Sequence, residues 1–153
     1  MLKYKTGDLF DPANNFNVIV HGCNCFHTMK SGVAKIIAEK YPEAVEADKT
    51  LTEYGDRGKL GTIVVAAHKL GDDLFLIVNA YTQYSYGRDK QHLDYGALRS
   101  CMKMINSNFV SSDYRVGMPL IGGGLAGGDH QEIKKILNET LTDIDITVVE
   151  LGT

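Results

Sequence analysis

The sequence predicts an α/β fold, because short apolar runs rich in Val and Ile alternate along the chain with longer amphipathic runs. Several of the short runs are apolar at consecutive positions, which is typical of a sheet covered by helices on both faces. The chain has 153 residues, and at ~150 residues per domain we expect residues 1–153 to form one domain.

Six apolar runs have the length and β-branched content of strands, and four amphipathic runs have apolar residues at helical spacing. Pro42 suits the first position of a helix, so a break between the first two helices is predicted at Tyr41. Asp129 is placed to cap the fourth helix, with Glu132 as its capping-box partner. The predicted strands are residues 2–5, 17–21, 62–66, 74–80, 115–119 and 144–150. The predicted helices are residues 31–40, 42–53, 93–106 and 129–140.

The composition excludes several classes of function. A formal net charge of -3 argues against non-specific binding of nucleic acid, which needs a basic surface to release counterions. Three cysteines and an N-terminal stretch without an apolar core predict a protein of the reducing cytoplasm rather than a disulfide-bonded secreted one. No apolar run approaches the ~20 residues that cross a bilayer, so no membrane-spanning role is expected.

Glycine is concentrated in one segment, because six of the sixteen glycines lie in residues 117–128, between a predicted strand and a predicted helix. A loop without Cβ atoms can turn several backbone N–H groups toward one point, and the following helix adds its positive N-terminal end. This arrangement predicts a phosphate or diphosphate site. The segment is not a Walker A loop, since no Gly-Lys-Ser/Thr follows, and it lacks the context of a Rossmann fingerprint. A flexible strand-to-helix turn is the alternative interpretation.

A second segment with chemical potential, residues 21–27, follows the second predicted strand. Its alternating His and Cys residues suggest zinc, but in an extended segment His21 and His27 would be ~20 Å apart, too far to share one ion. We therefore favour a packing role for Cys23 and Cys25. Asn24 either contacts a polyol at the end of the strand or forms a turn.

Three further segments are candidates with simple alternatives. Residues 30–34 open a helix at which Gly32 allows close approach of a ligand. Residues 79–87 are rich in Tyr and polar groups, so they form either the wall of a pocket or a surface loop. Asp8 ends the first strand, where it is either a functional residue or a turn or cap residue.

Together these segments resemble the macrodomain family, whose members bind ADP-ribose. The resemblance is carried by Gly7-Asp8-Leu9, His21-Gly-Cys-Asn24, Ser31-Gly-Val-Ala34 and the glycine loop of residues 119–129, which span nearly the whole chain. The sequence looks most like the branch with ADP-ribose 1''-phosphate phosphatases and enzymes that remove ADP-ribose from acidic residues or nucleic acid. The resemblance implies a three-layer α/β/α fold with a mixed central sheet.

The resemblance also assigns parts of the ligand to residues. Asp8 would accept a hydrogen bond from the adenine amino group, with the backbone of Leu9 beside it, and Asn24 would hold the distal ribose. Two sets of backbone amides would hold the diphosphate from opposite sides, with no metal or other cofactor. The first set is Ser31, Gly32 and Val33, and the second is Gly122, Gly123, Gly124, Leu125 and Ala126.

Two residues are candidates for catalysis. A lysine and an acid used by the terminal ADP-ribose hydrolases would fall near Gln83 and Ala126, so a lysine-adduct mechanism is not expected. His21 would titrate near neutrality and act as an acid or a base at the distal ribose, and Asp129 would orient a water molecule. The alternatives are a buried histidine bonded to backbone and a helix cap.

The resemblance therefore implies a metal-independent hydrolase acting at the distal ribose. Its substrate would be ADP-ribose 1''-phosphate or an ADP-ribosylated protein or nucleic acid. The main alternative is a reader that binds ADP-ribose or ADP-ribosylated targets without cleaving them. A module for another diphosphate, such as NAD, is a third hypothesis.

Overall fold

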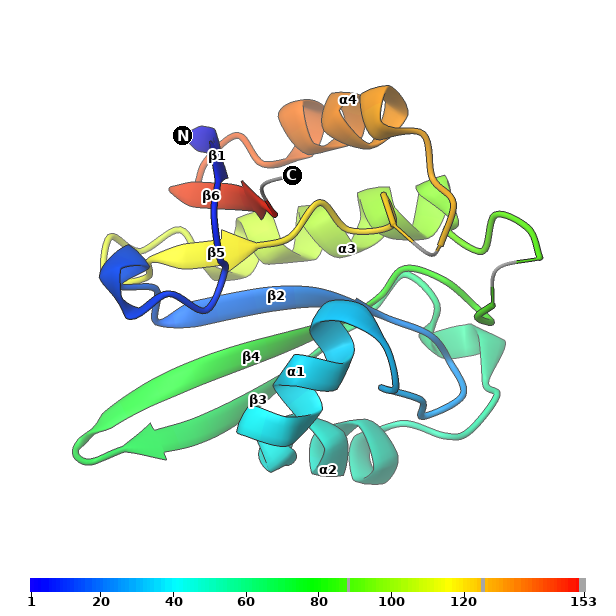
Figure 1. Cartoon of the computed structure of the whole chain (residues 1–153), viewed down its shortest axis with the longest axis horizontal. Helices are drawn as coiled ribbons and strands as arrows, with labels where there is room; N and C mark the ends of the chain where they lie inside the picture. The colour runs from blue at the N-terminus through cyan, green and yellow to red at the C-terminus, as the bar shows by residue number, and fades with distance from the viewer. Residues whose placement is uncertain (88, 125, 152–153) are drawn as a thin grey trace.

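The computed structural model describes residues 1–87, 89–124 and 126–151. These residues form a six-stranded sheet with two α-helices packed against each face (Figure 1). The strand order is β1-β6-β5-β2-β4-β3. The strands are β1 (Leu2–Thr6), β2 (Val18–Cys23), β3 (Ile63–Leu70), β4 (Asp73–Tyr81), β5 (Val116–Met118) and β6 (Ile146–Glu150). The α-helices are α1 (Gly32–Lys40), α2 (Pro42–Leu51), α3 (Tyr95–Asn108) and α4 (His130–Thr140), and short 3-10 helices span Pro12–Asn14 and Arg57–Lys59.

The sheet is mixed, because β3 and β4 pair antiparallel while all other neighbouring strands are parallel. All six predicted strands are present, and the predicted three-layer mixed fold is confirmed. The largest difference in a strand's end is in β3, which was predicted to end at Ala66 and continues to Leu70. His68 and Lys69 continue the pairing with β4 despite their polar side chains, so no hydrophobic signal marked this end of the strand.

Two apolar cores lie on opposite faces of the sheet, because successive side chains of a strand point to opposite sides. Val18 and Val20 of β2 pack in the core formed with α3 and α4, and Ile19 packs in the core formed with α1 and α2. Full burial of one such aliphatic side chain stabilises the fold by about 1.5–3 kcal/mol. The first core includes Leu98, Met102, Ile105, Ile133, Ile136 and Leu137 from the helices.

The four predicted helices are confirmed, with differences of one or two residues at some of their ends. Asp129 caps α4, since its Oδ1 accepts a hydrogen bond from the N–H of Gln131. The predicted capping-box role of Glu132 is wrong, because the Asp129 N–H donates to the hydroxyl of Tyr95 instead (3.0 Å). Helix α3 begins two residues later than predicted, after Asp94, whose side chain caps it.

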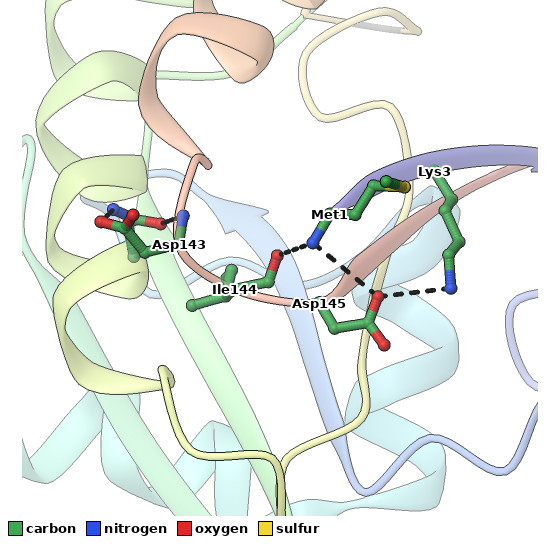
Figure 2. Close-up of polar contacts among 6 residues, drawn as sticks. Met1, Lys3, Asp143, Ile144 and Asp145 are labelled. Atoms are coloured by element: carbon green, nitrogen blue, oxygen red, sulfur yellow. Dashed lines mark hydrogen bonds and ion pairs between the residues drawn. The ribbon is translucent and has the colours of Figure 1, made fainter.

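Strand β1 is held at the edge of the sheet by pairing with β6 and by contacts of its first residues (Figure 2). The N-terminal amine of Met1 donates to the carbonyl oxygen of Ile144 (2.6 Å), and Lys3 Nζ lies 3.4 Å from Asp145 Oδ1. These charged groups are exposed, so the ion pair contributes at most about 1 kcal/mol. The parallel pairing is therefore the main reason for the position of β1.

The helices of the described residues were compared with what a membrane span requires. None of them is both long enough and apolar enough to cross a bilayer.

Candidate functional site

The candidate site lies at the end of β2 and β5, where these neighbouring strands send their connections to opposite faces of the sheet. The chain leaves β2 toward α1 on one face and leaves β5 toward α4 on the other (Figure 1). Such a divergence opens a crevice in which α/β proteins bind ligands. A cavity of about 550 Å³ lies there, within the range of roughly 300–1,000 Å³ that is typical of small-molecule sites.

Four segments line this cavity: the end of β2, the start of α1, the loop after β4 and the loop after β5. The structure brings together most of the binding residues predicted from the sequence. Those that line the cavity are His21, Asn24, Ser31, Gly32, Val33, Gly122, Gly124 and Ala126. The loop after β4 contributes Gln83, Tyr86 and Gly87, so of the two interpretations of residues 79–87, the wall of a pocket holds for these three residues.

Other predicted binding residues lie outside the cavity lining. Asp8 is exposed and its Oδ1 accepts a hydrogen bond from the N–H of Phe10, while Leu9 is buried beside a separate cavity of about 320 Å³. Gly123 faces away from the main cavity, because a Cβ built on it would lie 2.9 Å from His130 Nε2. Leu125 falls outside the residues that the structure describes. The adenine role of Asp8 and Leu9 stays a prediction.

The N-terminus of α1 opens into the cavity without a side-chain cap. Ser31 precedes the helix in an extended conformation and its side chain makes no capping hydrogen bond, whereas Asp94 and Asp129 cap α3 and α4. The backbone N–H groups of Gly32 and Val33 have no protein acceptor in the part of the chain described. Gly32 has a φ of +60°, a conformation that side chains with a Cβ rarely adopt. The positive end of the helix dipole therefore faces the cavity unneutralised.

The glycine loop bonds some of its amides within the loop and leaves two others without an acceptor among the described residues. The N–H of Gly123 donates to Leu120 O (3.1 Å), and the N–H of Gly128 donates to Gly122 O (2.8 Å). Gly122 has a φ of +79°, which completes the tight turn from Leu120. The N–H groups of Gly122 and Gly124 have no acceptor among the described residues, and both residues line the cavity. The loop and α1 thus present unpaired donors to the same space.

His21 is the one imidazole in the described lining, and it is fully buried. Its Nε2 lies 2.6 Å from Asn79 Oδ1, and Asn79 Nδ2 donates to the carbonyl of Ala44. Because Asn79 Oδ1 can only accept, Nε2 carries the hydrogen and Nδ1 has the lone pair. Burial lowers the pKa of His21 to about 4, partly offset by the hydrogen bond to Asn79 and by the charge of Asp48. The expectation that His21 titrates near neutrality is wrong, because the core excludes its charged form.

This pKa predicts a loss of stability in acid. Between pH 6.5 and about 4, the unfolded chain binds a proton at His21 that the folded protein does not. The free energy of unfolding should therefore fall as the pH is lowered through this range, by roughly 3 kcal/mol at ~1.4 kcal/mol per pKa unit. Denaturant titrations of the wild type and His21→Gln at several pH values measure this difference. If the free energies of unfolding of the wild type and His21→Gln differ by the same amount at every pH in this range, the assigned burial of His21 is contradicted.

Asn24 and Asp129 both have structural roles in this conformation. Asn24 Oδ1 accepts a hydrogen bond from the N–H of Phe26 (2.8 Å), and its Nδ2 donates to Thr28 O (3.0 Å), so Asn24 forms the turn that follows β2. One amide hydrogen of Asn24 is left for a ligand. Asp129 caps α4 and does not belong to the cavity lining. The ribose role of Asn24 and the catalytic role of Asp129 stay predictions.

The cysteines of the second segment are packing residues, as predicted. Cys23 and Cys25 are buried, and burial raises the pKa of both thiols. Thiols that resist ionisation are poor metal ligands. Within residues 1–87, 89–124 and 126–151, no group of three or more His, Cys, Asp or Glu side chains gathers in a way that could hold a metal ion.

Sequence reasoning missed two relationships at the site. Asn79 lies directly opposite His21 in the parallel pairing of β2 and β4, a contact that no spacing along the chain reveals. His130 contacts the glycine loop from the first turn of α4. Thr28 and Ile121 also line the cavity, and neither was predicted to. Each lies close in the sequence to predicted site residues, and this closeness is the only sequence feature that could have indicated them.

Comparison with known proteins identifies a family whose matched residues include the cavity lining. The Macro domain family matches residues 20–137, which run from within β2 to within α4 and include every residue that lines the cavity. The chain is 35% identical over 98% of its length to the "Uncharacterized 17.5 kDa protein in tk-vs intergenic region" of Enterobacteria phage T4, of which it covers 96%.

Two more distant proteins are similar over their full lengths. An ADP-ribose 1''-phosphate phosphatase of Saccharomyces cerevisiae is 22% identical, with 98% of each chain covered. The structure of the macrodomain of Mycobacterium tuberculosis DarG superposes with a TM-score of 0.80 at 21% identity, with 100% of this chain and 99% of that chain covered. On the match to the family and the identity to the phage protein, the chain belongs to the Macro domain family.

Proposed function

We propose that the protein binds ADP-ribose in the cavity between α1 and the glycine loop and hydrolyses ADP-ribose 1''-phosphate there. The observation that carries the proposal is the convergence of unpaired backbone amides on one cavity. Gly32 and Val33 contribute from α1, and Gly122 and Gly124 from the loop. Amides at a helix N-terminus and in a glycine loop suit a diphosphate, and they do so in a protein of net charge -3.

The proposed reaction needs only water as a second reactant. Water attacks the phosphorus of the 1''-phosphate, the bond from phosphorus to the ribose oxygen breaks, and that oxygen takes up a proton to give ADP-ribose and phosphate. His21 is neutral at pH 7 and has a lone pair on Nδ1, so its part would be to accept a proton from the attacking water. The name of the yeast relative supports this substrate.

A reader without catalytic activity is the second candidate, and the chemistry of the lining favours it. A pKa of about 4 makes His21 a weak base. The described lining residues include no carboxylate, and Lys30 is the one basic side chain among them other than His21. Binding by backbone amides needs neither group. Turnover is expected to be slow, because the lining offers no strong base and positioning would have to supply most of the rate enhancement.

Calorimetry with ADP-ribose and a phosphate-release assay with ADP-ribose 1''-phosphate test the proposal together. We expect both binding and release in the wild type. The variant His21→Gln should keep its affinity within about threefold and lose at least about 100-fold in the rate of release. Binding without release in the wild type would establish the reader instead. An absence of binding heat at millimolar ADP-ribose would refute both functions.

A further inference from the structure

One carbonyl of the glycine loop is held by a side chain. The Nε2 atom of His130, the first residue of α4, lies 2.6 Å from the carbonyl oxygen of Gly123. Since a carbonyl oxygen can only accept, the imidazole donates this hydrogen bond. The carbonyls of Gly122 and Gly124 are instead bonded by the backbone N–H groups of Gly128 and Gly127. The orientation of the Gly123 carbonyl therefore depends on a side chain that can be replaced.

The orientation of this carbonyl determines the direction of the next amide. In a planar trans peptide, the C=O of Gly123 and the N–H of Gly124 point to opposite sides. Neither Gly123 nor His130 lines the cavity, whereas Gly124 does, so the carbonyl is turned away from the cavity and the amide toward it. The Gly124 N–H has no acceptor in the described chain and is available to an anion.

Among the described residues, no backbone group makes a hydrogen bond to the Gly123 carbonyl or the Gly124 N–H of this peptide. Gly123 and Gly124 both lack a Cβ, so the peptide between them can rotate with little steric resistance. A Cβ built on Gly124 would meet no atom within 4 Å among the described residues other than its chain neighbours, so the space beside Gly124 is open to them. Rotation would direct the Gly123 carbonyl oxygen into the cavity, where its partial negative charge would repel a phosphate and one donor would be lost.

We propose that His130 is a positioning residue for the anion site: its hydrogen bond to Gly123 keeps the Gly124 amide directed into the cavity. The nature of the anion rests on the proposed function, but the orientation of the peptide does not. Because His130 is absent from the lining, it acts through the backbone and does not touch the ligand.

Three variants on the first turn of α4 test this role by calorimetry with ADP-ribose. His130→Ala removes the donor and should weaken binding about tenfold, the effect of losing one hydrogen bond to a charged group. His130→Gln supplies an amide N–H in place of the imidazole and should restore most of the affinity. Gln131→Ala is the matched control, because Gln131 is exposed and its side chain makes no hydrogen bond in the described structure. It should bind ADP-ribose like the wild type.

A merely structural role of His130 would lower the melting temperature without changing affinity for ADP-ribose in the folded variant. The crystal structure of ligand-free His130→Ala provides a readout that is independent of ADP-ribose. We expect the peptide between Gly123 and Gly124 to be rotated or present in two orientations. A variant with wild-type affinity, or a peptide fixed in its original orientation, would overturn the inference. If the wild type fails to bind ADP-ribose, the proposed function is wrong, and the peptide orientation in the crystal alone decides the role of His130.

Discussion

Replacing Gly124 with Val is expected to abolish ADP-ribose binding while leaving the fold intact. A Cβ on Gly124 meets no atom within 4 Å in the described part of the chain beyond its sequence neighbours, and Gly124 does not have the positive φ of Gly122 and Gly127, so the folded protein accepts a side chain there. The added methyl groups would occupy the cavity beside the Gly124 amide. We expect a loss of affinity of more than about 100-fold, equivalent to ~3 kcal/mol, measured by calorimetry.

The size of the side chain provides the control for this prediction. Gly124→Ala adds one methyl group and should weaken binding less than Gly124→Val, while both variants should melt within a few degrees of the wild type. Wild-type affinity in Gly124→Val would show that the ligand does not approach the loop at this residue. Gly123 is unsuitable for the same test, because a Cβ there would displace His130.

Replacing Asp48 with Ala is expected to cause the largest loss of stability. Asp48 of α2 is 2% exposed, and its Oδ1 accepts a hydrogen bond from the Tyr81 hydroxyl (2.7 Å). Thr52 donates to the Asp48 carbonyl and accepts from Lys59 Nζ (3.0 Å), and Lys59 is itself 5% exposed. Removal of the carboxylate leaves the buried Tyr81 hydroxyl without its acceptor and removes the side-chain partner of the Thr52 hydroxyl that Lys59 contacts. Leaving a buried polar group without its partner typically costs about 1–3 kcal/mol of the free energy of unfolding.

Two comparisons separate this effect from a general loss of packing. Glu46→Ala, at an exposed position of the same helix, should change the free energy of unfolding by less than about 0.5 kcal/mol. Asp48→Ala combined with Lys59→Met should be less destabilised than the sum of the single variants, because both residues contact Thr52. Denaturant unfolding measures the free energy of unfolding of Glu46→Ala, of the two single variants Asp48→Ala and Lys59→Met, and of the double variant. A loss below about 1 kcal/mol in Asp48→Ala would contradict a stabilising role for its buried hydrogen bonds.

The parts of the site that depend on neighbouring residues in the sequence could be predicted from it. The glycine cluster and the open N-terminus of α1 are visible in the sequence, because glycine spacing and helix starts are features of neighbouring residues. The orientation of each peptide is not local: Gly123 and Gly124 are identical in the sequence, but the contact with His130 makes one face the helix and the other the cavity.

The protonation of His21 also depended on tertiary structure. The sequence left a histidine that titrates near neutrality and a buried histidine as alternatives, and the pairing of β2 with β4 places Asn79 beside His21 in the core. Burial then outweighs the hydrogen bond and lowers the pKa. The same limit applies to Asp8, which follows β1 at the far side of β6 and β5 from β2, a separation that only the strand order reveals.

The central claim is that backbone amides from α1 and the glycine loop bind the diphosphate of ADP-ribose. A titration of ¹⁵N-labelled protein with ADP-ribose, followed by amide chemical shifts, tests it most directly. The largest shifts are predicted for the amides of Val33, Gly122 and Gly124, and saturation should occur at one ligand per chain. Unchanged resonances for these amides at saturating ADP-ribose, or shifts confined to the second cavity beside Leu9, would contradict the claim.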